Sequence, residues 1–517
     1  MDRNKGFYAK FFIFLALLLW LGIFLARKID LTSADLGRHL QNGKWVIENH
    51  FNLLEKNSPL FENYYSYTNS DFPVVNHHWG SGVVFYYIWK FFGFNGLSLF
   101  YILLSLAAFA VFFWIAWQGS NFTWAALPAF LLAPLMAERT EIRPEIFSVL
   151  FAAIFFYVLW QYSRGRMSWK RLVPLIPLQV IWVNFHVYFF VGPFLVGVFL
   201  SGELLQKKWK ETKILLATLA FFVLASLVNP FGFEGLLYPL KIFKNYGYTI
   251  VENKSVSFVE NYGVVNPNFT LIKAVLILMI SSFVLLFVVN RKKISIFYLL
   301  FSIFFGAMGW IAIRNFTLLG YFALPVLAYN FHNIFKQKEG ETNLVKENGI
   351  AALYIILAAI GLWCNYQYAS MHWKRAGIGL APGVAEAAEF FQKENIQGPI
   401  FNNYDIGGYL IFYLPKNEKV FVDNRPEAYP DAFFSEVYKP MQESTDVFEK
   451  FDREYNFNAV FFYSHDITPW GMNFLKIIKE NPNWTPVFGD DYAVIYLKKN
   501  ETNHSIIEKY QIPDTKY

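Results

Sequence analysis

The chain has 517 residues, of which 55% are hydrophobic, 20% are aromatic and only 16% are charged. Soluble domains carry about 25% charged residues, so this composition excludes an ordinary soluble protein and favours one that lies mostly in a membrane. The net charge of +6 is spread over loops between apolar runs, which indicates membrane topology and argues against a nucleic-acid partner. The single cysteine, Cys364, excludes an intramolecular disulfide and a cysteine-based metal site.

About eleven apolar runs between Phe11 and Tyr366 predict membrane-spanning helices, each of which needs roughly 20 residues. We place them near residues 9–27, 97–117, 122–138, 145–161, 172–185, 187–205, 213–229, 269–289, 294–312, 316–333 and 349–366. Basic clusters fall in four of the intervening loops, at 164–171, 207–213, 291–293 and 336–346. With a cytoplasmic N-terminus the positive-inside rule puts all four in the cytoplasm. We therefore expect a multi-pass protein of the inner (cell) membrane.

The sequence becomes more polar near the end of the last predicted span. We predict a multi-span domain over residues 1–368, with an outer loop at 28–82, and an extracytoplasmic α/β domain over residues 369–517. Strands are expected near 398–401, 419–422, 459–463 and 493–497, with helices near 384–395 and 470–480. This alternation predicts a partly parallel sheet. A second outer segment, 230–268, is also too long for a simple connection, and such loops are usually functional or carry their own structure.

The first charged cluster follows the first span. Asp35 and His39 would lie one helical turn apart on one face. A carboxylate beside an imidazole at a membrane edge is suited to proton transfer, so we predict a catalytic pair, with Arg38 of the same segment binding substrate. The alternative is an interfacial helix start, with Ser33 as N-cap and Asp35 interacting with the helix dipole.

Two neighbouring histidines, His77 and His78, precede the next span. Paired histidines bind a metal or hold a phosphate, and we predict that these two bind substrate. Adjacent histidines do not share a helix face, so a shared metal is a weak expectation, and interfacial anchoring is the alternative. A divalent metal is a possible cofactor, but the sequence identifies neither its ligands nor any other cofactor.

Arginines stand at two further outer positions. Arg139 and Arg143 belong to a turn with five charges in the eight residues 138–145, and guanidinium groups bind phosphate oxygens in pairs. We predict that both bind a lipid phosphate; the alternatives are a solvated turn or a structural network with the neighbouring acids. Arg314 is an isolated cation in the sequence near the outer end of the ninth span. It is predicted to bind substrate, and snorkelling to the interface is the alternative.

Asn184 and His186 interrupt an otherwise apolar stretch. Polar side chains at membrane depth usually face the interior of the helix bundle, so we predict a substrate-binding role. A hydrogen bond between helices is an equally good interpretation.

In the tail, polar residues follow two of the predicted strands, at 402–405 and 422–427. Ligands of α/β sheets bind at the carboxyl ends of strands, which makes both segments candidates. The chain contains no P-loop, HExxH or GxSxG element, which argues against ATP-driven transport and the common hydrolases.

These segments together resemble the GT-C glycosyltransferases, in particular a bacterial branch related to protein mannosyltransferases and Rgt-type enzymes. The resemblance rests on Ala34–Gly43 (ADLGRHLQNG), Ser66–Thr68, His77–Trp79, Arg143–Glu145, Trp182–His186, Asn229–Gly232, FNNYDIGGYL and VDNRPE. Many relatives carry paired acids in the first outer loop, whereas Asp35 has no acidic neighbour here. This departure puts metal dependence in doubt.

The resemblance implies a polytopic helical membrane enzyme that transfers a sugar from a polyprenyl-phosphate-linked donor to an outer glycan, lipid or protein acceptor. Asp35 would be the general base, and Arg139, Arg143 and Arg314 would neutralise the departing phosphate. The histidines would orient acceptor or phosphate. Two other classes of function remain open: a transporter or binding protein for lipid-linked saccharides, and a non-enzymatic protein of envelope assembly.

Overall fold

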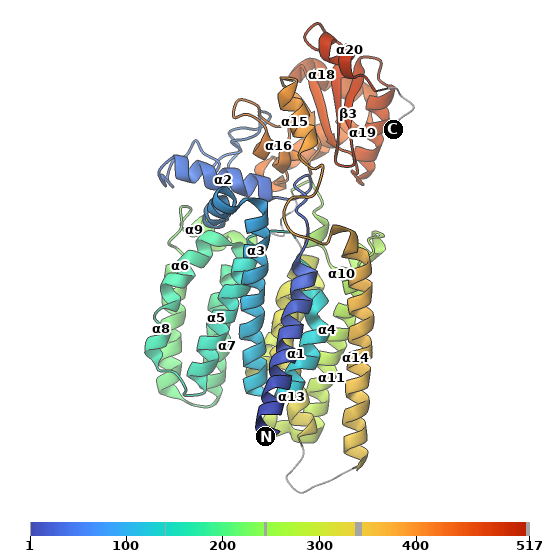
Figure 1. Ribbon diagram of the computed structural model, residues 1–517. Coiled ribbons are helices and arrows are strands. Elements are labelled where there is room, and N and C mark those ends of the chain that lie inside the picture. The colour runs from blue at the N-terminus through green and yellow to red at the C-terminus, as the bar shows by residue number, and fades with distance from the viewer. Residues whose placement is uncertain (1, 140, 242–243, 245, 337–343, 513–517) are drawn as a thin grey trace. The chain divides into compact units, whose positions relative to one another are not determined.

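The computed structural model of the chain describes residues 2–139, 141–241, 244, 246–336 and 344–512. Contacts between Cα atoms divide the chain into two compact units (Figure 1). Unit 1 consists of Met1–Lys28, Ser98–Pro239 and Ile250–Ile378. Unit 2 consists of Ile29–Leu97, Leu240–Thr249 and Gly379–Tyr517. The first outer loop and the tail, which are far apart in the sequence, therefore belong to the same unit.

Unit 1 is a bundle of apolar helices. They are α1 (Asp2–Leu25), α4 (Phe122–Met136), α5 (Glu145–Ser163), α6 (Leu175–Phe185), α7 (Val191–Leu205), α8 (Trp209–Ala225), α11 (Pro267–Asn290), α12 (Ile296–Ile311), α13 (Phe316–Phe335) and α14 (Leu344–His372), with the second half of α3 (Trp79–Gly119). Short helical turns connect them: η1 (Trp169–Arg171), η2 (Val187–Phe190), α9 (Phe233–Leu237), η3 (Tyr238–Leu240), η4 (Val251–Asn253), α10 (Val256–Asn261), η5 (Arg291–Lys293), η6 (Ile313–Asn315) and η7 (Trp373–Arg375).

Each of the eleven predicted spans coincides with one of these helices, which confirms a polytopic helical membrane protein. Among the described residues, six stretches are long and apolar enough to cross a membrane: Gly6–Leu25, Trp79–Gly119, Glu145–Ser163, Val187–Leu205, Pro267–Lys293 and Asn348–Arg375. The other spans are shorter or more polar helices. The basic cluster at 336–346 falls largely outside the described residues, and the predicted domain boundary at 368 lies inside α14.

The most buried helix of unit 1 is α13, which packs against α4, α11 and α12. Nearly every one of its side chains is buried, and apolar residues occur on all its faces. Such a helix belongs in a bundle interior. It begins directly after η6, which carries Arg314, so its start fixes one side of the site described below.

The helix α3 passes from unit 2 into unit 1 and is broken at Gly93. This residue has φ 63° and ψ −165°, a conformation that only glycine adopts without strain. The segment before the break carries the aromatic-rich stretch 83–92, and the segment after it contains the second predicted span.

Unit 2 contains a small mixed sheet with flanking helices. Its strands are β1 (Ile400–Asn402), β2 (Ala459–Tyr463), β3 (Trp484–Gly489) and β4 (Ala493–Lys498). Its helices are α2 (Leu36–Glu48), α15 (Glu386–Lys393), α16 (Gly407–Tyr413), η8 (Pro426–Ala428), the π-helix η9 (Phe433–Tyr438), α17 (Lys439–Glu443), α18 (Thr445–Tyr455), α19 (Pro469–Glu480) and α20 (His504–Tyr510).

The strand order in the sheet is β1-β2-β4-β3. The pair β1 and β2 is parallel, and the other two pairs are antiparallel, so the predicted partly parallel sheet is confirmed. A register shift between Pro486 and Phe488 interrupts β3, because proline has no N–H to donate to the ladder.

The strand predicted near 419–422 is wrong, because this segment forms only a single parallel bridge between Val420 and Ser66. The side chain of Asn402 takes the place of a neighbouring strand: its oxygen accepts from the Phe421 N–H at 2.9 Å, and its nitrogen donates to the Val422 carbonyl at 2.7 Å. The Ser66 hydroxyl donates to the Phe421 carbonyl at 3.1 Å. These bonds tie the first outer loop to the tail.

Candidate functional site

Three arginines predicted to bind substrate meet in unit 1. Arg139 and Arg143 lie in the turn between α4 and α5, and Arg314 lies in η6 before α13. Each arginine contacts a carboxylate of the α4–α5 turn or of the start of α5, and Arg139 and Arg143 also contact Glu252 of η4. We call this set the arginine cluster; it comprises Arg139, Arg143, Arg314, Glu141, Glu145 and Glu252.

Two carboxylates bridge the guanidinium groups of the arginine cluster. Arg139 Nη1 donates to Glu252 Oε2, and Arg139 Nη2 donates to Glu145 Oε1 at 3.1 Å. Arg143 Nη1 is 3.1 Å from Glu252 Oε1, and its Nη2 is 2.7 Å from Glu141. One carboxylate, Glu252, thus binds two arginines. This arrangement is the structural network that the sequence left open for the turn, and a phosphate-binding role stays a prediction.

Arg314 is part of the same network and is not the isolated cation that the sequence suggested. Its Nη2 lies 3.4 Å from Glu145 Oε1, and its Nη1 donates to Asn253 Oδ1 at 2.8 Å. Neither partner is near Arg314 in the sequence. The side chain is only 15% exposed, so it does not snorkel to solvent but is held by charge.

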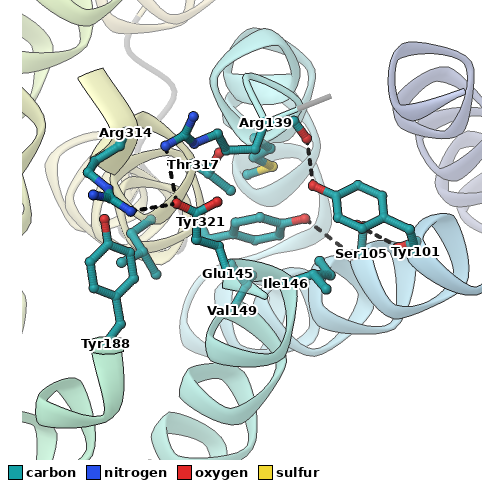
Figure 2. A pocket seen from close by; sticks show the side chains of 12 residues that line it. Tyr101, Ser105, Arg139, Glu145, Ile146, Val149, Tyr188, Arg314, Thr317 and Tyr321 are labelled. Carbon is teal, nitrogen blue, oxygen red and sulfur yellow. Dashed lines mark hydrogen bonds and ion pairs between the residues drawn. The ribbon is translucent and has the colours of Figure 1, made fainter. Parts of the chain in front are cut away.

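A narrow cavity lies against these groups (Figure 2). Its volume of about 10 Å³ leaves roughly the room for one water molecule. It is lined by Tyr101, Ser105, Met136, Arg139, Glu145, Ile146, Val149, Tyr188, Arg314, Thr317, Leu318 and Tyr321. Within the described residues, Arg139 Nε, Arg314 Nε and Glu145 Oε2 are buried and make no hydrogen bond. The cavity thus has a largely apolar wall, and the charged groups beside it retain unused hydrogen-bonding capacity.

The pKa values of two glutamates at the cluster are shifted in opposite directions, one by neighbouring charge and the other by burial. Burial by itself would raise the pKa of Glu252, but Arg139, Arg143 and Arg314 hold this pKa well below its usual range. Burial raises the pKa of Glu138, although Asn266 and Asn268 donate to its carboxylate. Glu252 is thus an anion, and the cluster balances three guanidinium groups with three carboxylates.

Asn184 and His186 make hydrogen bonds inside unit 1. Asn184 Nδ2 donates to the carbonyls of Val180 and Val228, both at 2.8 Å. His186 Nδ1 is 2.9 Å from the Ser148 hydroxyl, which also accepts from Trp182 Nε1 at 2.7 Å. These bonds link α6 to the end of α8 and to α5, as the interhelical interpretation expects. A substrate role for either residue stays a prediction.

The predicted catalytic pair lies in unit 2. Asp35 occupies the N-cap position of α2, so the assignment of this position to Ser33 is wrong. The His39 N–H donates to the Asp35 carbonyl at 3.1 Å, which confirms the one-turn spacing. The Asp35 carboxylate also forms an ion pair with Arg38, whose Nη2 lies 3.4 Å away. Asp35 is 21% exposed at its side chain and remains accessible.

The adjacent histidines His77 and His78 come together with His39, which lies 38 positions earlier in the sequence on α2. The ring centroids of His39 and His78 are 5.3 Å apart, and those of His77 and His78 are 3.8 Å apart. The reason is a close backbone approach of α2 and α3: a Cβ on Gly43 would lie 2.1 Å from the Gly82 carbonyl oxygen. Only glycine at both positions permits this packing. We call Asp35, Arg38, His39, His77 and His78 the acid–histidine cluster.

The tail segment 422–427 also reaches the acid–histidine cluster. Arg38 Nε donates to Asn424 Oδ1 at 3.3 Å. The next residue, Arg425, donates to Asp423 through Nε at 2.9 Å and to Asn63 of the first outer loop at 2.9 Å. Burial raises the pKa of Glu427 although Arg38 and Arg425 oppose this shift. The polar segment after the predicted strand therefore meets the charged start of α2.

Comparisons with known proteins find similarity in structure alone. No family model matches the chain, and no curated protein matches it by sequence. The solved structure of the oligosaccharyltransferase AglB from Archaeoglobus fulgidus, in complex with an inhibitory peptide and a dolichol-phosphate, matches with a TM-score of 0.61 at 12% identity over 96% of this chain and 75% of that chain. The apo form of the Archaeoglobus fulgidus oligosaccharyltransferase matches with a TM-score of 0.58 at 12% identity, over 94% and 74%.

ArnT from Cupriavidus metallidurans, in its apo state, matches with a TM-score of 0.52 at 13% identity over 96% of this chain and 98% of that chain. Both AglB and ArnT are GT-C membrane glycosyltransferases. The chain has the GT-C fold. The predicted fold is thereby confirmed, and the match extends over both units of this chain.

Among the residues that the structure describes, no group of three or more histidine, cysteine, aspartate or glutamate side chains is arranged to hold a metal ion. The divalent metal that the sequence left open thus has no assigned ligands in this part of the chain and stays a prediction.

Sequence reasoning missed Glu252 of the arginine cluster and the partner that Arg38 has in the tail. Glu252 is 113 positions from Arg139 and lies in the long outer segment 230–268. The length of that segment was the only signal for it. Asn424 was included in a candidate segment, but nothing in the sequence pointed to Arg38 as its partner, since 386 positions separate them.

Proposed function

We propose that the protein is a membrane glycosyltransferase that transfers a sugar from a polyprenyl-phosphate-linked donor to an extracytoplasmic glycan, lipid or protein acceptor. The observation that carries this proposal is the GT-C fold over 96% of the chain, shared with AglB, whose solved complex holds a dolichol-phosphate. A lipid-phosphate donor also suits the arginine cluster, because guanidinium forks bind carboxylate and phosphate oxygens alike.

The reaction is a displacement at the anomeric carbon of the donor. The acceptor oxygen forms a bond to this carbon, and the bond between the carbon and the phosphate oxygen breaks. The acceptor hydroxyl proton passes to the Asp35 carboxylate, and the bonding electron pair leaves with the lipid phosphate. A general base of this kind contributes about 10²–10⁴ in rate. Asp35 suits the role because its side chain is 21% exposed and can be reached by an acceptor.

The other predicted residues take supporting roles. Arg139, Arg143 and Arg314 neutralise the phosphate as it gains charge, which is the electrostatic stabilisation that fixed guanidinium groups provide. Arg38 orients the Asp35 carboxylate through their ion pair, in which Arg38 Nη2 lies 3.4 Å from Asp35 Oδ1. His39, His77, His78, Asn184 and His186 orient acceptor or phosphate by hydrogen bonding.

We also infer that the N-terminus is cytoplasmic and that the tail from about residue 369 is extracytoplasmic. The basic loops near 164–171, 207–213 and 291–293 support this orientation through the positive-inside rule. A reporter that is active only outside the cytoplasm should give signal when fused after Lys498 and none when fused after Arg166. The reverse pattern would overturn the orientation.

Activity is tested with the purified full-length protein and a panel of radiolabelled polyprenyl-phosphate sugars. One donor in the panel should give labelled acceptor or, in the absence of acceptor, slow release of labelled sugar to water. A folded protein that binds none of the lipids and transfers none of the sugars would contradict the proposal.

A further inference from the structure

Glu252 occupies a particular position in the arginine cluster. Its two carboxylate oxygens bind two different guanidinium groups: Oε2 accepts from Arg139, and Oε1 accepts from Arg143 at 3.1 Å. Phosphate oxygens bind arginine forks with the same two-point geometry. A carboxylate that bridges two guanidinium groups therefore makes the contacts that a bound phosphate would make.

The charges of the two groups also match. The phosphate of a polyprenyl-phosphoryl sugar is a diester and carries one negative charge, as does the Glu252 carboxylate. With Glu252 in place, three guanidinium groups face three carboxylates. If the diester replaced Glu252, the cluster would keep a net charge of zero. If the diester bound beside Glu252, a buried excess negative charge would result, which is costly.

We propose that the Glu252 carboxylate takes the position of the donor phosphodiester at Arg139 and Arg143, and that donor binding exchanges one anion for the other. This inference rests on the proposed function, since it assigns the phosphate of that donor to these two arginines. Glu252 is in this view an internal competitor of the donor and not a catalytic residue.

Among the three acids of the cluster, Glu252 is the one that can move away from the arginines with the least disruption of the fold. Glu145 is the first residue of α5, is 8% exposed, and is shared by Arg139 and Arg314. The N-terminal end of a long helix also stabilises its charge. Glu141 accepts from Arg143 Nε and Nη2, and its side chain is 40% exposed. Glu252 belongs to η4, a turn of three residues within a long outer segment, so its departure disrupts no long helix.

The test compares Glu252→Gln with Glu260→Gln in the full-length protein. Glu260 lies in α10 of the same outer segment and pairs with Lys273 at 2.6 Å, so both variants remove one paired negative charge from one loop. The probe is the methyl ester of a short-chain polyprenyl phosphate, a diester that carries one negative charge as the donor does, and the corresponding polyprenol and inorganic phosphate are the comparisons. Binding is measured in detergent by calorimetry.

The methyl ester should bind Glu252→Gln about 10- to 100-fold more tightly than the wild type, because it no longer breaks two charge-assisted hydrogen bonds. Glu260→Gln should bind the phosphate probe as tightly as the wild type does. The polyprenol should bind all three proteins with equal affinity. Inorganic phosphate should show the same preference more weakly if the headgroup alone drives exchange. Unchanged or weaker binding of both phosphates by folded Glu252→Gln would overturn the proposal.

A second measurement uses the wild type, so the proposal stays testable if the variant does not fold. The same methyl ester should increase amide hydrogen exchange in peptides that cover Val251–Asn253, because η4 loses its contact with the arginines. Decreased or unchanged exchange there, with binding demonstrated, would overturn the proposal. Exchange of the two anions without any sugar transfer would instead contradict the proposed function and leave this inference intact.

Discussion

The arginine cluster of unit 1 and the acid–histidine cluster of unit 2 hold their charges in different ways. In the arginine cluster each guanidinium group contacts a carboxylate, and the partners come from three separate loops. In the acid–histidine cluster the ion pair of Asp35 with Arg38 lies on the same helix as His39, whose ring is near that of His78. The arrangement of the arginine cluster depends on charge balance, whereas that of the acid–histidine cluster depends on the close backbone approach of α2 and α3. Substitutions that alter charge and substitutions that alter backbone distance should therefore separate them.

The largest effect is expected from Asp35→Asn. The amide keeps the shape of the side chain but cannot accept the acceptor proton, so transfer should fall by about 10²–10⁴. The variant should still insert, fold and bind donor, since the arginine cluster is unaltered. Initial transfer rates and donor affinity are measured on the same preparation. Wild-type turnover by a folded Asp35→Asn protein would remove Asp35 from the mechanism.

The next effect concerns Arg143, which tests whether the arginine cluster binds donor. Arg143→Ala should weaken apparent donor affinity about 10- to 100-fold, because hydrogen bonds to a charged group are lost. Arg143→Lys keeps the charge but loses the fork and should show a partial loss. Donor-concentration kinetics separates affinity from rate. If Arg143→Ala kept both at the wild-type level, the turn would be structural and Arg139 or Arg314 would become the candidate.

A backbone change should act on the acid–histidine cluster alone. In Gly43→Ala the new methyl carbon would lie 2.1 Å from the Gly82 carbonyl oxygen, so α2 and α3 must move apart. Overpacking of this kind costs about 1–3 kcal/mol. We expect a lower thermal midpoint and reduced transfer with unchanged donor binding. The control is Gly197→Ala in α7, where no atom lies within 4 Å of the new carbon. Equal effects of the two substitutions would contradict the packing argument.

The smallest effects are expected from pH, and they have opposite signs for two glutamates near the arginine cluster. The pKa of Glu252 is depressed in the folded state, so its contribution to stability is present above the unfolded pKa and is lost as the pH falls through the folded pKa. The thermal midpoint of Glu252→Gln should therefore be below that of the wild type at neutral pH and should approach it in strong acid.

Glu138 has a raised pKa, so its stabilising contribution is full below the unfolded pKa and is lost as the pH rises through the folded pKa. Glu138→Gln fixes the neutral form, so its thermal midpoint should exceed that of the wild type only on the alkaline side of that transition. Thermal unfolding of both variants from acid to neutral pH measures the two differences. Parallel curves for Glu138→Gln and Glu252→Gln would contradict the opposite environments of the two acids.

The helices and much of the sheet could be predicted from local sequence. Each predicted span coincides with a helix because a long apolar run must satisfy its backbone hydrogen bonds internally when it lies in lipid. Strands β1, β2 and β4 were predicted for a related reason, since buried apolar runs between turn residues pair as strands. The strand β3 was missed because Pro486 and Gly489 interrupt its pattern. The segment 419–422 has a strand pattern, but the Asn402 side chain satisfies part of its backbone.

The candidate residues were identified by type, but their partners were decided by tertiary structure. Asp35, Arg139 and Arg314 are conspicuous in the sequence because charge near a membrane is costly. Which group balances each charge depends on loops 61 to 386 positions apart, as in Arg314 with Asn253 and Arg38 with Asn424. A local pattern cannot encode such a pairing, because Coulomb attraction and hydrogen bonding act through space and only the packed helices bring these side chains within reach.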